Sequence, residues 1–133
     1  MSELITVDQS RVGITVLTLN RPEKRNALSI ELLMQLCARV ESLAAERTNR
    51  VLIITGAGSV FSAGLDLMEA SNPVLVQRSA ACVAGALQLL RSTRLITIAA
   101  AHGGAFAGGA GLMAACDIAI GTSDLKIGFP EVR

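Results

Sequence analysis

A glycine-rich stretch, AHGGAFAGGAGL at residues 101–112, is the first candidate for chemistry in this sequence. A run made almost entirely of Gly and Ala has few side chains to pack, so its value lies in its backbone. The apolar segment 95–100 before it predicts a buried strand, and residues 109–116 after it can form a helix. A glycine turn between a strand and a helix directs free N–H groups at an anion or a polarised oxygen.

A second glycine-containing element lies upstream and follows the same logic. Residues 51–55 are continuously apolar, as in a strand that is buried on both faces, and a GAG turn at 56–58 and the segment FSAGLD at 61–66 follow. The GAG sequence lacks the later glycine and the lysine of a phosphate-binding loop, so it predicts a turn. Two strand–turn–helix units can supply two converging N–H donors, which is the outline of an oxyanion hole.

The composition of the chain argues against several classes of function. A formal net charge of +1 and an aromatic content of 2% give no case for nucleic acid or a charged membrane surface as a partner. Three cysteines lie in apolar runs, as in proteins of a reducing compartment, and acidic residues interrupt the start where a signal peptide would be apolar. We therefore expect a cytoplasmic protein, and 133 residues favour one domain.

Two polar residues near the glycine-rich stretch are expected to be structural. His102 is the only histidine and has no second metal-binding side chain at a suitable spacing, so we expect a turn or core histidine and no metal site. Asp117 is expected to fix the entry of the next strand, beyond the site.

The same region also has the length of a membrane span. Residues 95–116 carry no charge apart from a possible one on His102, and they contain a GxxxG pair. Five glycines, the histidine, and the lack of an aromatic belt or a basic flank favour the strand–turn–helix interpretation instead.

Strands alternate with helices along the chain, which predicts an α/β architecture with parallel pairing. Residues 4–7 and 12–19 are strand-like and are expected to form a hairpin that turns around Gly13. Ser29 is a candidate N-cap for an amphipathic helix that runs to about Arg47.

A second long helix is expected after a short helical turn that begins at Asp66. Asn72 as its N-cap with Pro73 at the first helical position predicts a start at this point, and the helix is expected to end near Arg91. Short strands are expected at 118–121 and 126–128, and Pro130 is expected to begin another helix.

Four motifs in this order resemble the enoyl-CoA hydratase/isomerase (crotonase) family: RPEKRNAL, FSAGLDL, GGAFAGGAGLMAACDIAIG and IGFPEVR. The resemblance covers nearly the whole chain and implies a crotonase-like spiral of β-β-α units. Members of that family are about twice as long. Residues 1–133 therefore resemble a single N-terminal core domain that is incomplete, truncated before the C-terminal helices.

The resemblance implies roles for three residues in catalysis. In the family, two backbone N–H groups hold the thioester oxygen, and they fall on Leu65 and Gly108 here. Glu131, in the FPE sequence, matches one catalytic glutamate and would act as acid and base. Read without the family, the two glycine turns are tight turns and Glu131 is an ordinary acidic residue in the first turn of a helix.

The resemblance also implies a binding site for the CoA thioester. Lys24 and Arg25 would meet the phosphates of CoA, although a solvated loop explains them equally well. The residues that correspond to the adenine and pantetheine pocket are Ala27, Ala63, Asp66, Leu67 and Met68. Asp66 can cap a helix at the same time. CoA would be part of the substrate, and no metal or redox cofactor is implied.

The main departure from the family is at Gly111, where the hydratases carry their second catalytic glutamate. Glycine cannot activate water, so Glu131 is left as the one candidate base in the matching positions. A single carboxylate suits proton transfer between the α and γ carbons of an enoyl-CoA. The gap weakens hydration of a 2-enoyl-CoA as the activity without excluding it.

Two alternatives to an active enzyme remain open. One is a crotonase-like protein that binds CoA thioesters or acts as a scaffold without turnover, and the other is an inactive truncated fragment. The family assembles as trimers and hexamers, so the intact protein is expected to self-associate. In the 133 residues alone, we expect exposed apolar faces on the helices at 28–47 and 73–91 and on the helix from Gly109. We therefore expect this chain to aggregate or to associate through those faces, and to show no turnover.

Overall fold

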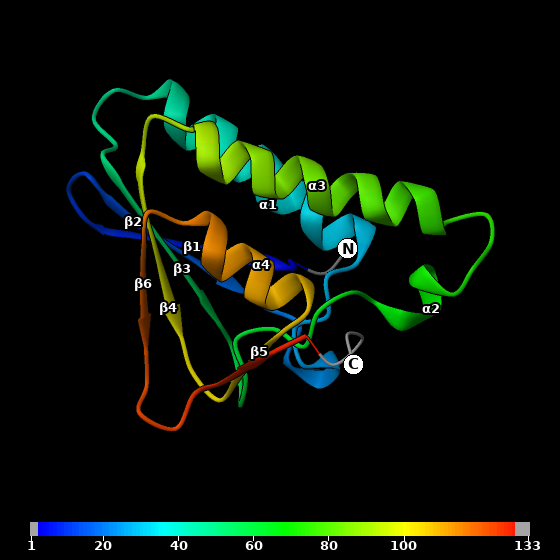
Figure 1. Ribbon diagram of the computed structural model, residues 1–133. Helices are drawn as coiled ribbons and strands as arrows, with labels where there is room; N and C mark the ends of the chain where they lie inside the picture. Colours follow the sequence, from blue (N-terminus) through cyan, green and yellow to red (C-terminus); the bar gives the residue numbers. More distant parts are fainter. Residues whose placement is uncertain (1–2, 130–133) are drawn as a thin grey trace.

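The computed structural model describes residues 3–129, which form a five-stranded sheet covered on one side by helices (Figure 1). The strand order is β1-β2-β3-β4-β6, and a separate two-stranded sheet pairs β5 with β7. The strands are β1 (Ile5–Arg11), β2 (Ile14–Leu19), β3 (Val51–Gly56), β4 (Ile96–Ala101), β5 (Gly104–Phe106), β6 (Ile118–Gly121) and β7 (Lys126–Gly128). The helices are η1 (Pro22–Lys24), α1 (Ile30–Ala45), α2 (Leu67–Ala70), α3 (Val76–Ser92) and α4 (Gly108–Ala115).

The expected α/β architecture is confirmed. β1 and β2 form the expected antiparallel hairpin, with Gly13 at φ +81° in the turn, and β1 continues to Arg11 instead of ending at Val7. β2, β3, β4 and β6 pair in parallel. Parallel strands end at the same edge of the sheet, so the loops after β3 and β4 lie close together.

Alternation along the strands places the core between the sheet and the helices. In β2, β3 and β4, every second side chain is buried, and the intervening ones are half-buried or exposed. The expectation that residues 51–55 are buried on both faces is therefore wrong, because the helices cover one face of the sheet and leave the other half-buried. α1 follows its amphipathic pattern: Ser29 accepts a hydrogen bond from the amide of Leu32 at 3.1 Å, and the apolar face lies in the core. Figure 1 shows α1 and α3 side by side, and α4 packs beside α3 over β4.

The expected start of α3 is wrong by three residues. The helix begins at Val76 with Leu75 at the N-cap position. Oδ1 of Asn72 accepts a hydrogen bond from the amide of Val74 at 2.8 Å, and its carbonyl accepts one from Leu75 at 3.0 Å. Asn72 therefore forms a turn before the helix. An Asn–Pro pair can begin such a turn as well as cap a helix.

β5 is a strand within the stretch that the sequence predicts as a glycine turn. It pairs in parallel with β7, and the three paired positions place Phe106 opposite Gly128. A strand of three residues that depends on a partner about twenty residues away has no local sequence signal. The stretch 95–116 thus contains β4, β5 and α4, and none of the helices among residues 3–129 has the length and hydropathy that crossing a bilayer requires.

The buried side chain of Asn26 ties the loop after β2 to the loop after β3. Its Oδ1 accepts a hydrogen bond from the amide of Arg21 at 2.8 Å, and its Nδ2 lies 2.8, 3.0 and 3.1 Å from the carbonyl oxygens of Ala57, Val60 and Phe61. Asn26 is fully buried and has φ +55°, a left-handed conformation in which Asn is enriched. These contacts set the relative positions of two loops that carry predicted site residues.

We predict that Asn26→Ala destabilises the fold by about 3 kcal/mol, because buried carbonyl and amide groups lose their partner. Asn20→Ala is the matched control, since the Asn20 side chain makes one exposed hydrogen bond to the carbonyl of Glu3. Chemical denaturation of the three proteins measures the difference. Asn26→Asp keeps Oδ1 and the shape but places an oxygen against three carbonyls, so it should also destabilise. A change below about 1 kcal/mol in both Asn26 variants would contradict the role of this side chain.

Candidate functional site

A cavity of about 860 Å³ gathers all the predicted site residues that the structure describes. These are Lys24, Arg25, Ala27, Ala63, Leu65, Asp66, Leu67, Met68 and Gly108. Arg21, Ala70, Val83 and Ala107 complete the lining. The remaining predicted residue, Glu131, lies outside the described residues. Loops after β2 and β3, the start of α2 and the start of α4 thus meet at one place.

The amide of Leu65 faces away from the neighbouring strand-like segment. Leu65 forms a parallel bridge with Leu28 through its two neighbours: the amide of Leu28 donates to the carbonyl of Gly64 at 2.7 Å, and the amide of Asp66 donates to the carbonyl of Leu28 at 3.4 Å. In an extended segment, successive N–H groups point in opposite directions. The N–H of Leu65 therefore points to the other side, and it has no acceptor among residues 3–129.

The amide of Gly108 is the first N–H of α4 and is likewise unpaired within the described chain. The carbonyl of Ala107, in the same peptide, accepts a hydrogen bond from the amide of Gly111 at 3.0 Å. Because a trans peptide is planar, a carbonyl that points along the helix directs the N–H of Gly108 off the helix N-terminus. The positive end of the helix dipole lies at this amide.

The two donor turns lie in direct contact. A Cβ atom placed on Gly64 would lie 2.9 Å from the carbonyl oxygen of Phe106 and 3.6 Å from the amide nitrogen of Gly108. Gly64 also has φ +103°, so only glycine fits this position. Ser62 joins the same two segments, since its carbonyl accepts a hydrogen bond from the amide of Phe106 at 3.0 Å. The arrangement can hold an oxygen atom that gains negative charge.

An ion pair joins the loop after β2 to the N-terminus of α2. Oδ2 of Asp66 lies 2.8 Å from Nη1 of Arg21, and Oδ1 of Asp66 caps α2 by accepting a hydrogen bond from the amide of Glu69 at 3.2 Å. Burial raises the pKa of the Asp66 carboxyl, but the hydrogen bonds from Arg21 and Glu69 outweigh it and lower the pKa overall. Asp66 is therefore an ionised cap, as expected, with a partner that the sequence did not indicate.

Lys24 and Arg25 form the exposed, cationic rim of the cavity. Arg21 is neutralised by Asp66, whereas neither rim residue has an ion-pair partner among residues 3–129. The rim thus keeps two positive charges that are available to an anionic ligand.

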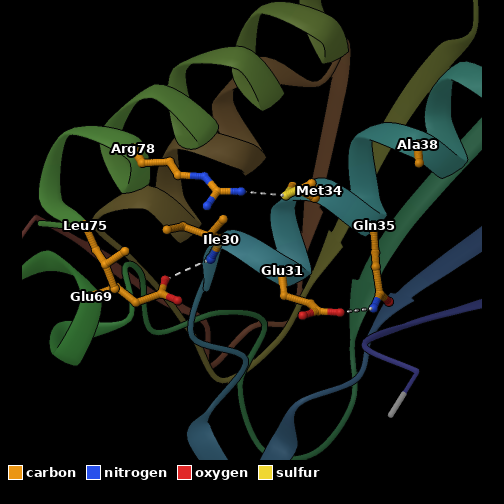
Figure 2. Close-up of a pocket in the computed structure, with 8 residues that line it drawn as sticks. All are labelled: Ile30, Glu31, Met34, Gln35, Ala38, Glu69, Leu75 and Arg78. Carbon is orange, nitrogen blue, oxygen red and sulfur yellow. Dashed lines mark hydrogen bonds between the residues drawn. The ribbon is translucent and has the colours of Figure 1, made fainter. Parts of the chain in front are cut away.

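A second cavity of about 580 Å³ lies between α1, α2 and α3 and contains none of the predicted site residues (Figure 2). Oε1 of Glu69 accepts a hydrogen bond from the amide of Ile30, the first residue of α1, at 2.8 Å. Nη2 of Arg78 lies 3.6 Å from Sδ of Met34. Glu69 is thus a helix cap supplied from another element, which fixes α2 to α1. The sequence contains no local signal for it, because 39 residues separate the partners.

The two polar residues near the glycine-rich stretch have the expected structural roles. Nε2 of His102 lies 2.8 Å from the carbonyl oxygen of Gly58, in a turn. Asp117 accepts hydrogen bonds from the amide and the hydroxyl of Thr97 at 2.9 and 3.3 Å, at the entry of β6. Burial raises the pKa of the Cys116 thiol to about 11, which leaves the thiol protonated and unreactive at neutral pH.

Gly111 faces α3, whereas β7 contacts the turn that precedes the donor amide of Gly108. A Cβ atom on Gly111 would lie 3.6 Å from both terminal carbons of Leu87 in α3, and Gly111 does not line the cavity. The amide of Ala107 donates to the carbonyl of Gly128 at 2.9 Å. The end of β7 is therefore hydrogen-bonded to the donor turn.

Comparison with known proteins identifies relatives of this chain. The Enoyl-CoA hydratase/isomerase family model matches residues 9–133. The chain is 37% identical to the 2,3-dehydroadipyl-CoA hydratase of Escherichia coli (strain K12), over 99% of this chain and 51% of that protein. It is 31% identical to the mitochondrial Delta(3,5)-Delta(2,4)-dienoyl-CoA isomerase of Rattus norvegicus, over 98% of this chain and 44% of that protein.

Solved structures show the same relationship. The enoyl-CoA hydratase from Bacillus anthracis superimposes with a TM-score of 0.92 at 32% identity, over 97% of this chain and 51% of that chain. The predicted crotonase-like fold is thereby confirmed. The chain spans about half the length of the curated relatives it matches. A family match over residues 9–133, a shared fold and a cavity at the matching motifs lead to one conclusion: the chain belongs to the enoyl-CoA hydratase/isomerase family.

Proposed function

We propose that the protein containing this chain acts on an acyl-CoA thioester as an enoyl-CoA hydratase or isomerase. The thioester oxygen accepts hydrogen bonds from the amides of Leu65 and Gly108, and the phosphates of CoA meet Lys24 and Arg25. The observation that carries the proposal is that two backbone donors and two cations line one cavity, and none of the four has a partner among residues 3–129. CoA is part of the substrate, and the proposal needs no other cofactor.

Backbone donors suit this chemistry because negative charge develops on the thioester oxygen when a proton leaves the α carbon. Donors that are already fixed by β7, α4 and Leu28 need no reorganisation as that charge grows. Apolar side chains of the lining, which include Val83, Leu67 and Met68, suit the remainder of the acyl-CoA.

Glu131 is the proposed acid and base. It would move a proton between the α and γ carbons of a 2- or 3-enoyl-CoA, or assist the addition of water to a 2-enoyl-CoA. With glycine at position 111, the proposal favours isomerisation over hydration. Both activities appear in the names of the relatives reported above.

A protein that binds acyl-CoA without turnover, or an inactive fragment, is the alternative. Gly111 favours it, because this position supplies no carboxylate. The product formed from a 2-enoyl-CoA, compared with that from a 3-enoyl-CoA, separates hydratase, isomerase and non-catalytic binding.

Self-association, as a trimer or hexamer of the intact protein, belongs to the same proposal. The exposed apolar side chains do not lie where we expected them, on the three predicted helices. α1 and α3 expose only Met34 and Val76 among large apolar residues, whereas β6 exposes Ile118 and Ile120 on an edge strand without charged residues. Such an edge favours contacts with other chains.

Gly108→Pro removes the proposed donor while keeping a residue that is tolerated at the first position of a helix. In the form of the protein that turns over an enoyl-CoA, we expect the rate to fall about 10²–10³-fold. Gly108→Ala is the control, because it keeps the N–H and adds a Cβ atom 3.1 Å from the flexible end of Leu28. Circular dichroism checks the fold of both. A folded proline variant with the wild-type rate would exclude Gly108 as a donor.

Glu131→Gln tests the acid and base in the same protein. The rate should fall about 10²–10⁴-fold, because proton transfer is lost while the shape of the side chain is kept. Binding of a saturated acyl-CoA, measured by calorimetry, should change little. If activity stays within a few-fold of wild type, Glu131 has no part in the reaction.

We predict that the 133-residue chain self-associates through β6. In analytical ultracentrifugation, Ile118→Lys/Ile120→Lys should shift the chain towards the monomer, because lysines on an edge strand oppose pairing. Val12→Lys/Val74→Lys adds the same charge at two exposed turn residues and should leave association unchanged. Equal association of both double variants would place the contact elsewhere.

A further inference from the structure

Ala107, the residue before the Gly108 donor, has a backbone conformation that normally requires glycine. Its φ is +50° and its ψ is −117°. Two other residues that are not glycine, Arg25 and Asn26, have positive φ in the described chain, and Arg25 lies in the ordinary left-handed helical region. The angles of Ala107 are instead those of the first central residue of a type II′ turn, where glycine is the rule. A side chain at this position is therefore strained.

Contacts on both sides hold Ala107 in this conformation. Its amide donates to the carbonyl of Gly128 in β7 at 2.9 Å, and its carbonyl accepts from the amide of Gly111 in α4 at 3.0 Å. The positive φ lets two successive amides point in different directions. The first pairs with β7, and the second, of Gly108, has no acceptor within the described part of the chain. These hydrogen bonds explain the backbone conformation of Ala107. They do not explain why the position holds alanine, with its methyl group, where glycine would be unstrained.

The methyl group of Ala107 lies where the two donor turns meet. Ala107 lines the cavity, and its Cβ lies 3.0 Å from the position that a Cβ on Gly64 would occupy. Gly64 precedes the donor Leu65 as Ala107 precedes the donor Gly108. An oxygen held by both amides therefore sits beside this methyl group, and the atoms bonded to the carbonyl carbon come next to it.

The geometry points to Ala107 as a specificity-determining residue that selects acyl thioesters with an unbranched α carbon. This inference rests on the proposed function, because it takes the thioester oxygen to lie between Leu65 and Gly108. A branch at the α carbon places an additional methyl group next to the carbonyl, where the Ala107 methyl already fills the wall. Glycine at this position would relieve the backbone strain and open that space.

The test measures by isothermal titration calorimetry how tightly the intact protein binds two isomeric ligands, butanoyl-CoA and 2-methylpropanoyl-CoA. Both are saturated, so binding is measured without turnover, and they differ only in branching at the α carbon. Wild type should favour the linear isomer by at least about tenfold, the effect of one misplaced methyl group in a fitted pocket. Ala107→Gly should reduce that preference about tenfold and raise Tm by about 2–6 °C, because strain is relieved.

Two further variants separate specificity from stability. Ala107→Ser keeps the Cβ atom and adds an oxygen, so it should keep or increase the preference for the linear isomer. Ala110→Gly removes a buried methyl group from the same helix, away from the cavity lining, and should lower Tm without changing the preference. An unchanged preference in Ala107→Gly would overturn the inference while leaving the proposed function intact. If wild type binds neither thioester, the proposed function itself fails.

Discussion

The site depends first on one buried amide side chain, that of Asn26. It lies between the loops after β2 and β3 and pairs with main-chain groups of both, which would otherwise lose these partners. The backbone of the same residue accepts a hydrogen bond from the hydroxyl of Ser62 at 2.8 Å. The loop that carries the cationic rim and the loop that carries Leu65 are thereby held as one unit.

Close approach of main chains is the second constraint. A Cβ atom on Gly109 would lie 2.5 Å from the carbonyl oxygen of Ser62, so α4 can reach the loop after β3 only with glycine at this point. Gly64, in the loop after β3, must also be glycine, because a Cβ atom there would lie 2.9 Å from the carbonyl oxygen of Phe106. The functional groups that we propose for the site are mainly backbone amides, which explains why the glycine pattern, rather than a set of polar side chains, indicates its place in the sequence.

Sequence patterns predict most of the elements, because the helices are amphipathic and the central strands are continuously apolar. Spacing alone leaves the donors ambiguous between a tight turn and an oxyanion hole, and the family motifs assign them to Leu65 and Gly108. Long-range contacts are not predictable in this way: Asn26 with Val60, Arg21 with Asp66 and Glu69 with Ile30 are each separated by more than thirty residues. The strain at Ala107 is equally hidden, because its φ is imposed by β7 and α4 together.

The central claim is that two backbone amides hold the oxygen of a thioester carbonyl. Isotope-edited infrared spectroscopy of an acyl-CoA labelled with ¹³C at that carbonyl observes the bond itself when the ligand binds. Two hydrogen bonds from fixed donors weaken the C=O bond, so the account predicts a carbonyl stretch at lower frequency in the bound ligand than in water. A bound ligand whose carbonyl frequency equals or exceeds that in water would contradict it.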